Sequence, residues 1–234
     1  MPLPAPTIVI FDMDGTTVRH LNPLVLHILE KIDDIGFRLS KIWDWIFRRK
    51  AQGPIVSPKE EEEYRNWRKP RLYGHRLLHK VRRKEVDEVV EPCPGIYQVL
   101  NLLKDKNIPM ALASNGLGKG YGHDIMDRFG LKEYFKVTIF REDVRKSKPN
   151  PEGLLKALED MQITLKPEDV VWHIGDRHKD VKATIAAEEN LPCTTIPIAY
   201  GVSAAAAIVE KNLGADHIFL SYQDVFKRLK SLLP

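Results

Sequence analysis

Residues 9–17 read VIFDMDGTT, a run of β-branched and aromatic residues that ends in two aspartates. The hydrophobic part predicts a buried strand over Thr7–Phe11, because strands favour such residues and disfavour Asp and Gly. Side chains alternate along an extended chain, so we expect Asp12 and Asp14 to point the same way. Two carboxylates this close repel each other unless a cation or a shared proton lies between them. A plain Asp-Gly turn would fit the same residues, so the rest of the chain must distinguish a turn from a site.

The composition is typical of one globular α/β domain with an insertion. The chain has 234 residues, of which 43% are hydrophobic and 29% are charged. Its N-terminus lacks the pattern of a signal peptide. The uncharged stretch over residues 191–209 contains two prolines and a glycine, which argue against a membrane helix. It predicts instead a strand over Thr194–Ala199 and a helix with Ser203 as N-cap. Two cysteines without metal or disulfide spacing favour a cytoplasmic protein.

Residues 19–90 differ from the rest of the chain in pattern and in charge. Apolar residues recur there at helical spacing and no strand pattern appears, which predicts a helical insertion. Residues 38–84 contain 15 Lys and Arg against 5 Asp and Glu, a net charge of +10, whereas the whole chain carries +4. This asymmetry indicates a separate unit. The predicted domains are therefore a core of residues 1–18 and 91–234 and an insert of residues 19–90.

Beyond the insert, short hydrophobic runs alternate with amphipathic segments. The expected strands are residues 109–113, 137–140, 170–174, 194–199 and 217–220. The expected helices are residues 94–106, 119–129, 151–161, 180–189, 203–213 and 222–232. This alternation predicts an α/β fold with a Rossmann-like, doubly wound and mostly parallel sheet that carries helices on both faces. Ligands of such sheets bind beyond the carboxyl ends of the strands.

Polar residues follow four of the predicted strands at that edge of the sheet. The first strand ends in Asp12 and Asp14, the second in Ser114-Asn115-Gly116 and the fourth in Gly175-Asp176-Arg177. A short loop after the third strand brings Lys148 ahead of a helix that opens with proline. Carboxylates, a hydroxyl and an ammonium group on one edge have complementary chemistry. The pattern therefore favours a site over a simple turn.

Four motifs of the chain resemble those of the haloacid dehalogenase-like superfamily of phosphohydrolases. They are DMDGT, LASNG, KPNPEG and GDRHKD, in the order and spacing of that family. The tail LGADHIFLSYQDV is similar to the C-terminal segment of its phosphoglycolate phosphatase-like branch. The resemblance covers residues 8–226 except the insert. It implies that residues 19–90 are a helical cap that closes over the active site.

The resemblance also implies roles for the carboxylates. Asp12 is expected to attack phosphorus and to form an aspartyl-phosphate, which splits one difficult step into two. Asp14 is expected to protonate the leaving group and later to take a proton from the hydrolytic water. Mg²⁺ prefers oxygen ligands, and the expected ones are the Asp12 side chain, the Asp14 backbone carbonyl and Asp176.

The remaining motif residues are expected to hold the phosphoryl group. Ser114 and Lys148 would bind phosphoryl oxygens with their side chains, and Asn115 would do so with its backbone N–H. Asp180 is expected to orient either a metal-bound water or Lys148, although a charge at a helix N-terminus would also explain it.

Four further residues near the motifs are not among the expected catalytic, phosphate-binding or metal-binding residues. His173 lies inside a strand pattern, and we expect a histidine of the core or of its rim there and not a catalyst. Arg177 and His178 depart from the small or hydroxylic residues common at these positions, and either substrate contact or exposure to solvent fits them. Thr17 stands where the family often has Leu, so the resemblance does not predict how the chain packs at the hinge of the cap.

We expect a Mg²⁺-dependent phosphatase of a small, anionic phosphomonoester, without a membrane span and either monomeric or homodimeric. A phosphomutase on the same fold stays open, because cap residues decide whether water or substrate accepts the phosphoryl group. A C–halogen hydrolase would not need the Asp14–Asp176 metal pattern. A protein that binds nucleic acid or an anionic surface through the basic insert is the alternative outside enzymes. The full set of catalytic residues argues against it, so no nucleic-acid partner is expected.

Overall fold

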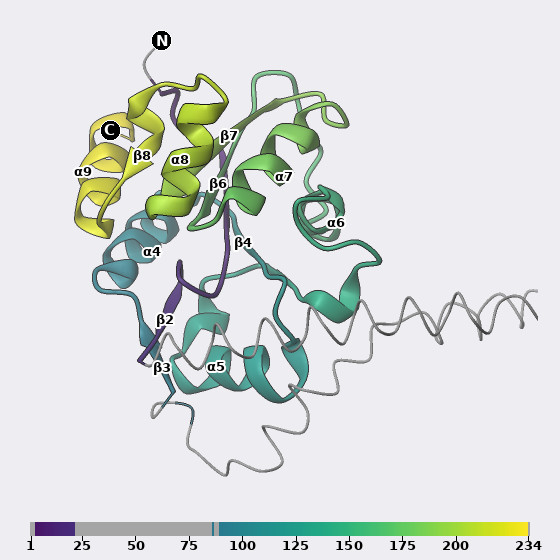
Figure 1. Cartoon of the computed structure of the whole chain (residues 1–234), viewed down its shortest axis with the longest axis vertical. Helices are drawn as coiled ribbons and strands as arrows, with labels where there is room; N and C mark the ends of the chain where they lie inside the picture. The colour runs from purple at the N-terminus through teal and green to yellow at the C-terminus, as the bar shows by residue number, and fades with distance from the viewer. Residues whose placement is uncertain (1–2, 22–85, 87–88, 234) are drawn as a thin grey trace, which may run out of the picture. The chain divides into compact units, whose positions relative to one another are not determined.

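A six-stranded parallel sheet forms the centre of the described part of this computed structural model (Figure 1). The structure describes residues 3–21, 86 and 89–233. The chain divides into two compact units, Met1–His20 with Val86–Pro234, and Leu21–Glu85. The sheet belongs to the first unit. The predicted helices of the insert and its basic segment lie outside the described residues.

The strand that carries the DMDGT motif lies in the middle of the sheet. The order is β5-β4-β1-β6-β7-β8, and every neighbouring pair is parallel. In the register, Ile10 of β1 lies opposite Ala111 of β4 and His173 of β6. The strands are β1 Ile8–Phe11, β4 Met110–Ala113, β5 Val137–Ile139, β6 Val170–Gly175, β7 Thr194–Tyr200 and β8 Ile218–Phe219. The predicted α/β fold with a mostly parallel sheet is therefore confirmed.

Helices cover both faces of this sheet, as Figure 1 shows. Side chains alternate along β1, so Val9 and Phe11 join the hydrophobic cluster formed with α4 and α9. Ile8 and Ile10 face the opposite way and join the cluster formed with α6 and α7. Helix α8 packs against α7 and β7. The helices are α4 Ile96–Asp105, α5 His123–Arg128, α6 Glu152–Asp160, α7 His178–Glu188, α8 Val202–Glu210 and α9 Tyr222–Leu232.

Two short strands contradict the expectation that residues 19–90 hold no strand. Strand β2, Val18–His20, pairs antiparallel with β3, Val90–Pro92, and forms a two-stranded ribbon. Each strand has three residues, which is too short for an alternating pattern to stand out. Their partners also come from opposite ends of the insert, so no local turn signals the pairing.

Two helix starts also differ from the prediction. The expected helix over 119–129 is divided into a π-type turn over Gly118–Gly122 and α5, because Gly120 adopts a left-handed φ of 75°. Helix α8 has Gly201 as its N-cap, and not Ser203. The Ser203 hydroxyl oxygen instead accepts a hydrogen bond from the backbone N–H of His178, at 3.3 Å. Short 3₁₀ turns cover Leu131–Glu133, Arg141–Asp143 and Ala215–His217.

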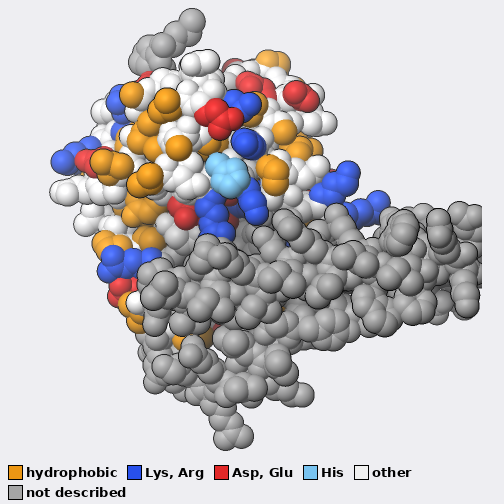
Figure 2. Space-filling view, in the orientation of Figure 1, with side chains coloured by type: hydrophobic (Ala, Val, Ile, Leu, Met, Phe, Trp, Pro, Cys, Tyr) orange, Lys and Arg blue, Asp and Glu red, His pale blue; other side chains and the backbone are white. Residues whose placement is uncertain are grey.

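The stretch over residues 191–209 forms strand β7 and most of α8, as its prolines predicted. Within the described residues, no helix combines the length and the apolar character that crossing a bilayer requires. On the face seen in Figure 2, hydrophobic side chains lie scattered among charged ones over the described part of the chain.

His173 of β6 lies in the core, in agreement with the expectation. Its Nδ1 is 2.7 Å from the Thr184 hydroxyl oxygen, and that hydroxyl donates to the Asp180 carbonyl at 2.8 Å. The hydroxyl has one hydrogen, so Nδ1 must be the donor towards Thr184. Nε2 is buried without a hydrogen-bond partner among the described residues. Burial lowers the pKa of His173 to about 3, so the ring is neutral at pH 7.

We predict that His173→Gln changes the acid dependence of stability. The pKa of histidine in the unfolded chain is about 6.5, so the unfolded state binds the extra proton between about pH 6.5 and about pH 3. The wild type therefore loses stability as the pH falls through this window, whereas glutamine does not titrate. The variant should be about 1–3 kcal/mol less stable at pH 7, and this difference should shrink towards pH 4.

Urea unfolding of both proteins, at several pH values between about 7 and 4, measures the difference. His178→Gln is the matched control, because His178 is exposed. A difference in unfolding free energy that stays constant over this range would show that His173 is not buried as a neutral ring.

Candidate active site

The loop after β1 holds Asp12 and brings it towards β6. The N–H of Asp12 donates to the Ile174 carbonyl at 2.9 Å, which extends the pairing of β1 with β6 by one residue. Gly15 follows with a φ of +84°, and a Cβ there would lie 2.3 Å from Oδ2 of Asp176. Only glycine fits at this position without strain. The loop can therefore approach Asp176 closely.

Lys148 lies between two buried carboxylates. Its Nζ is 2.6 Å from Oδ1 of Asp12, 2.7 Å from Oδ1 of Asp180 and 2.8 Å from the Ala113 carbonyl oxygen. Burial alone would lower the pKa of the ammonium, but the charges of Asp12 and Asp180 outweigh it, so the pKa of Lys148 is raised. The lysine is therefore a fixed positive charge beside Asp12.

Asp180 has two contacts that fix its position. Oδ1 pairs with Lys148, and Oδ2 accepts the N–H of Arg177 at 3.0 Å, where α7 begins. Burial would raise the pKa of Asp180, but the charge of Lys148 outweighs it, and the pKa is lowered. Asp180 therefore contacts Lys148, which is one of the two groups that it was expected to orient, and its carboxylate also caps the helix.

Three carboxylates form a cluster that fits a divalent cation. One oxygen from each of Asp12, Asp176 and Asp180 lies within 4.8 Å of the others. Oδ1 of Asp176 is buried without a hydrogen-bond partner among the described residues. Burial raises the pKa of Asp176 to about 7, because uncompensated negative charge is unfavourable in this place, whereas at Asp12 the charge of Lys148 opposes the effect of burial on the pKa. A hard cation such as Mg²⁺ would supply the missing compensation.

The carboxylates of this cluster differ in their hydrogen-bond partners. Both oxygens of Asp180 already have partners in Lys148 and the Arg177 N–H, whereas Oδ1 of Asp176 has none in the described part. This favours Asp12 and Asp176 as the carboxylates that would hold the metal, with Asp180 beside them. The Asp14 backbone carbonyl stays a prediction as the third ligand.

Asp14 has partners different from those of Asp12. Oδ1 of Asp14 accepts the Tyr121 hydroxyl at 2.7 Å, and Nε2 of His20 lies 3.2 Å from the same oxygen. Burial would raise the pKa of Asp14, but the bonds from His20 and Tyr121 outweigh it, so the pKa is lowered. The sequence did not indicate His20 or Tyr121, because they lie 101 residues apart and neither directly follows a predicted strand.

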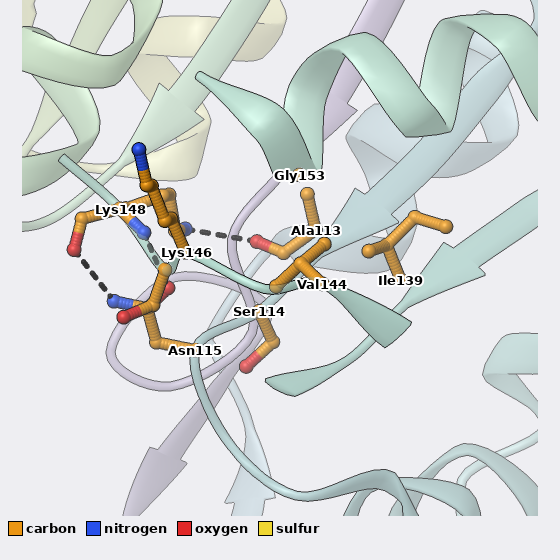
Figure 3. Close-up of a pocket in the computed structure, with 9 residues that line it drawn as sticks. Ala113, Ser114, Asn115, Ile139, Val144, Lys146, Lys148 and Gly153 are labelled. Atoms are coloured by element: carbon orange, nitrogen blue, oxygen red, sulfur yellow. Dashed lines mark hydrogen bonds between the residues drawn. The ribbon is translucent and has the colours of Figure 1, made fainter. Parts of the chain in front are cut away.

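The predicted phosphate-binding residues lie on two loops that are joined by Asn115. Its Oδ1 accepts the N–H of Lys148 at 2.9 Å, and its Nδ2 donates to the Lys148 carbonyl at 3.1 Å (Figure 3). The sequence had suggested a role only for the Asn115 backbone. The Ser114 hydroxyl oxygen accepts the Gly116 N–H at 2.9 Å. The Asn115 side chain therefore fixes the main chain that carries the Lys148 ammonium.

A small pocket adjoins these two loops (Figure 3). Ser114, Asn115 and Lys148 line it, together with Ala113, Ile139, Val144, Lys146, Ser147 and Gly153. The carboxylates Asp12, Asp14 and Asp176 are not part of this lining. The pocket therefore lies between the two loops, β5 and the start of α6, and the carboxylates predicted to be catalytic are not in its lining.

Of the other residues that the sequence singled out, Thr17 has the closest link to Asp12. The Thr17 hydroxyl donates to the Asp12 carbonyl at 2.7 Å and is buried, so a hydroxyl is useful where the family often has Leu. Nε of Arg177 lies 3.9 Å from Oδ2 of Asp176, at the limit of an ion pair. His178 is exposed. The structure thus places Arg177 beside the carboxylate cluster and His178 on the surface.

Comparisons with known proteins agree with this geometry. The family model described as haloacid dehalogenase-like hydrolase matches residues 6–188. The chain is 25% identical over 187 residues to the pyrophosphatase PpaX of Listeria welshimeri, covering 78% of this chain and 80% of that protein. It is 28% identical over 137 residues to the phosphoglycolate phosphatase of Shigella boydii, covering 57% of this chain and 51% of that protein.

One solved structure is similar in fold to this chain. The crystal structure of a HAD-superfamily hydrolase from Ehrlichia chaffeensis superposes with a TM-score of 0.60 at 21% identity, covering 99% of this chain and 100% of that one. The family model and the phosphatase relatives confirm the resemblance seen in the motifs and the expected enzyme class, a phosphoric monoester hydrolase. The chain belongs to the haloacid dehalogenase-like hydrolase family.

Proposed function

We propose that this chain is a Mg²⁺-dependent phosphatase that hydrolyses a small, anionic phosphomonoester through an aspartyl-phosphate on Asp12. The observation that carries the proposal is the pairing of buried Asp12 with Lys148, 2.6 Å away, at the carboxyl end of the central strand. A lysine in this place favours an ionised Asp12 and offers a positive charge to the phosphoryl oxygens. Asp14 has its own partners and stays separate from this ion pair.

In the first step, a carboxylate oxygen of Asp12 forms a bond to phosphorus while the bond from phosphorus to the ester oxygen breaks. Asp14 must enter this step protonated, although the bonds from His20 and Tyr121 lower its pKa, and it gives that proton to the departing ester oxygen. In the second step, water attacks phosphorus, Asp14 takes a proton from it, and the bond between Asp12 and phosphorus breaks. The net result is an alcohol and inorganic phosphate, with both aspartates returned to their starting state.

The other residues assist by fixed charge and position. Lys148 would neutralise phosphoryl oxygens, and Asp180 and Asn115 hold it in place. The Ser114 hydroxyl and the Asn115 backbone N–H are proposed donors to the phosphoryl group. Mg²⁺, held by Asp12 and Asp176 with the Asp14 carbonyl, would supply further positive charge at the phosphoryl group.

Two observations support an anionic substrate. The two relatives named above are a pyrophosphatase and a phosphoglycolate phosphatase, and both pyrophosphate and phosphoglycolate carry a second negative group near the reacting phosphorus. Residues 38–84 of this chain carry a net charge of +10. A positive field of this kind raises the local concentration of anions. We therefore propose a substrate with a carboxylate or a second phosphate beside the phosphomonoester.

We predict phosphate release from such substrates only in the presence of a divalent metal. The full chain would be assayed with phosphoglycolate, pyrophosphate, a sugar phosphate and p-nitrophenyl phosphate, with Mg²⁺ or with EDTA. EDTA should abolish turnover and excess Mg²⁺ should restore it. Asp12→Asn should lower kcat by about 10³ or more, because an amide is a poor nucleophile and carries no charge.

Asp105→Asn is the matched control, because Asp105 is exposed at the end of α4. Full activity in EDTA would contradict the metal assignment, and full activity of Asp12→Asn would contradict the nucleophile. An isomeric sugar phosphate as product in place of inorganic phosphate would indicate a phosphomutase. A chain that releases no phosphate from any substrate but binds nucleic acid would support the binding alternative.

A second prediction separates the roles of the two aspartates. Asp14→Asn keeps the backbone carbonyl and an oxygen acceptor for Tyr121 but cannot transfer the proton. It should lower kcat by about 10² for alkyl phosphates and by much less for p-nitrophenyl phosphate, whose leaving group needs no proton. Steady-state kinetics on both substrates measures this. Equal losses on the two would contradict the role of Asp14 as the acid in the first step.

A further inference from the structure

Three side chains from distant parts of the sequence meet at Asp14. His20 ends β2, Tyr121 lies in the turn over Gly118–Gly122, and Asp14 lies in the loop after β1. Tyr121 is 107 residues from Asp14 and 101 residues from His20. The side chain of His20 is 7% exposed, and Tyr121 is buried. The fold therefore brings two polar groups to one carboxylate in a mostly buried place.

Hydrogen-bond counting fixes the direction of the bonds. The Tyr121 hydroxyl has one hydrogen, and it donates this to Oδ1 of Asp14 at 2.7 Å. Nε2 of His20 is 2.6 Å from the tyrosine oxygen, so His20 must be the donor in that contact. The same N–H lies 3.2 Å from Oδ1 of Asp14. Both groups therefore contact Oδ1 of Asp14, and their rings are nearly parallel, with 14° between the planes.

The other oxygen of Asp14 lies on the side of the predicted phosphate-binding loop. A Cβ placed on Gly116 would be 3.0 Å from Oδ2 of Asp14 and 3.2 Å from the Ser114 hydroxyl oxygen. Oδ2 and the Ser114 hydroxyl therefore lie on the same side of Gly116. His20 and Tyr121 contact Oδ1. The two oxygens of Asp14 are thus in different surroundings.

We propose that His20 and Tyr121 are positioning residues that hold Oδ1 of Asp14, so that Oδ2 is the oxygen that exchanges protons with the substrate and the water. This inference rests on the proposed phosphatase function. A carboxylate free to rotate would present either oxygen, whereas one held at Oδ1 keeps Oδ2 in one place. Misplacing a catalytic group by about 1 Å can cost about 10²-fold in rate. Loss of the His20 or Tyr121 contact should therefore lower kcat most for substrates whose leaving group needs a proton.

Tyr121→Phe removes the hydroxyl and keeps the ring. We expect kcat to fall at least about 10-fold for alkyl phosphates and less than about 3-fold for p-nitrophenyl phosphate, with KM within about 2-fold for both. His20→Ala should behave in the same way, and His20→Gln should recover part of the rate because its amide can donate. Tyr134→Phe is the matched control, because the Tyr134 hydroxyl bonds Asn101 in an exposed place.

The double variant Asp14→Asn with Tyr121→Phe tests whether the tyrosine acts through Asp14. If it does, the second change should lower kcat for alkyl phosphates by less than about 2-fold beyond Asp14→Asn alone. Equal losses on alkyl and aryl phosphates, a loss in KM alone, or full additivity would overturn the proposal.

A measurement that does not depend on activity separates this proposal from the proposed function. In ¹⁵N-histidine NMR of the full chain, the Nε2 resonance of His20 should shift in Tyr121→Phe and in Asp14→Asn but not in Tyr134→Phe. An unchanged resonance in the first two variants would overturn the contact itself. Absence of phosphate release by the wild type, with the shifts present, would instead overturn the phosphatase function and leave the arrangement of His20 and Tyr121 supported.

Discussion

The ion pairs of Lys148 are the interaction on which the geometry of the site depends. Asp12 and Asp180 are both buried, and two negative charges in such a place are costly unless a positive charge lies between them. The Lys148 ammonium stays between the two carboxylates because its main chain is fixed. The Asn115 side chain fixes it by hydrogen bonds to the N–H and to the carbonyl of Lys148. The ends of β1 and β4 and the start of α7 therefore meet at one ammonium group.

The sequence predicted the sheet and its helices because hydrophobic periodicity is strong in buried parallel strands and amphipathic helices. It failed where structure depends on a single backbone angle or on distant partners. Gly120, with its positive φ, breaks the helix expected over 119–129, and Gly201 takes the N-cap place expected for Ser203. The β2–β3 ribbon has three residues in each strand, and its pairing joins opposite ends of the insert.

In the site, too, positions marked by local sequence signals could be predicted, whereas contacts between distant residues could not. Asp12, Asp14, Asp176 and Lys148 follow strand ends or stand in recognisable motifs, so their place at one edge of the sheet could be predicted. Their hydrogen-bond partners could not be predicted, because a single sequence holds no signal for contacts such as Tyr121 with His20, which are 101 residues apart. The Thr17 hydroxyl is an intermediate case, because the motif singles out its position but the sequence holds no signal for its bond to the Asp12 carbonyl.

The β2–β3 ribbon has a consequence for the segment between its two strands. Val18 pairs with Pro92 and His20 with Val90, so the chain leaves the core and returns to it at adjacent points, and an ion pair of 2.6 Å between Arg19 and Glu91 joins the two strands. Closing a longer loop between fixed neighbouring ends adds little entropy cost. The segment between the two strands can therefore change in length while the residues at the edge of the sheet keep their positions.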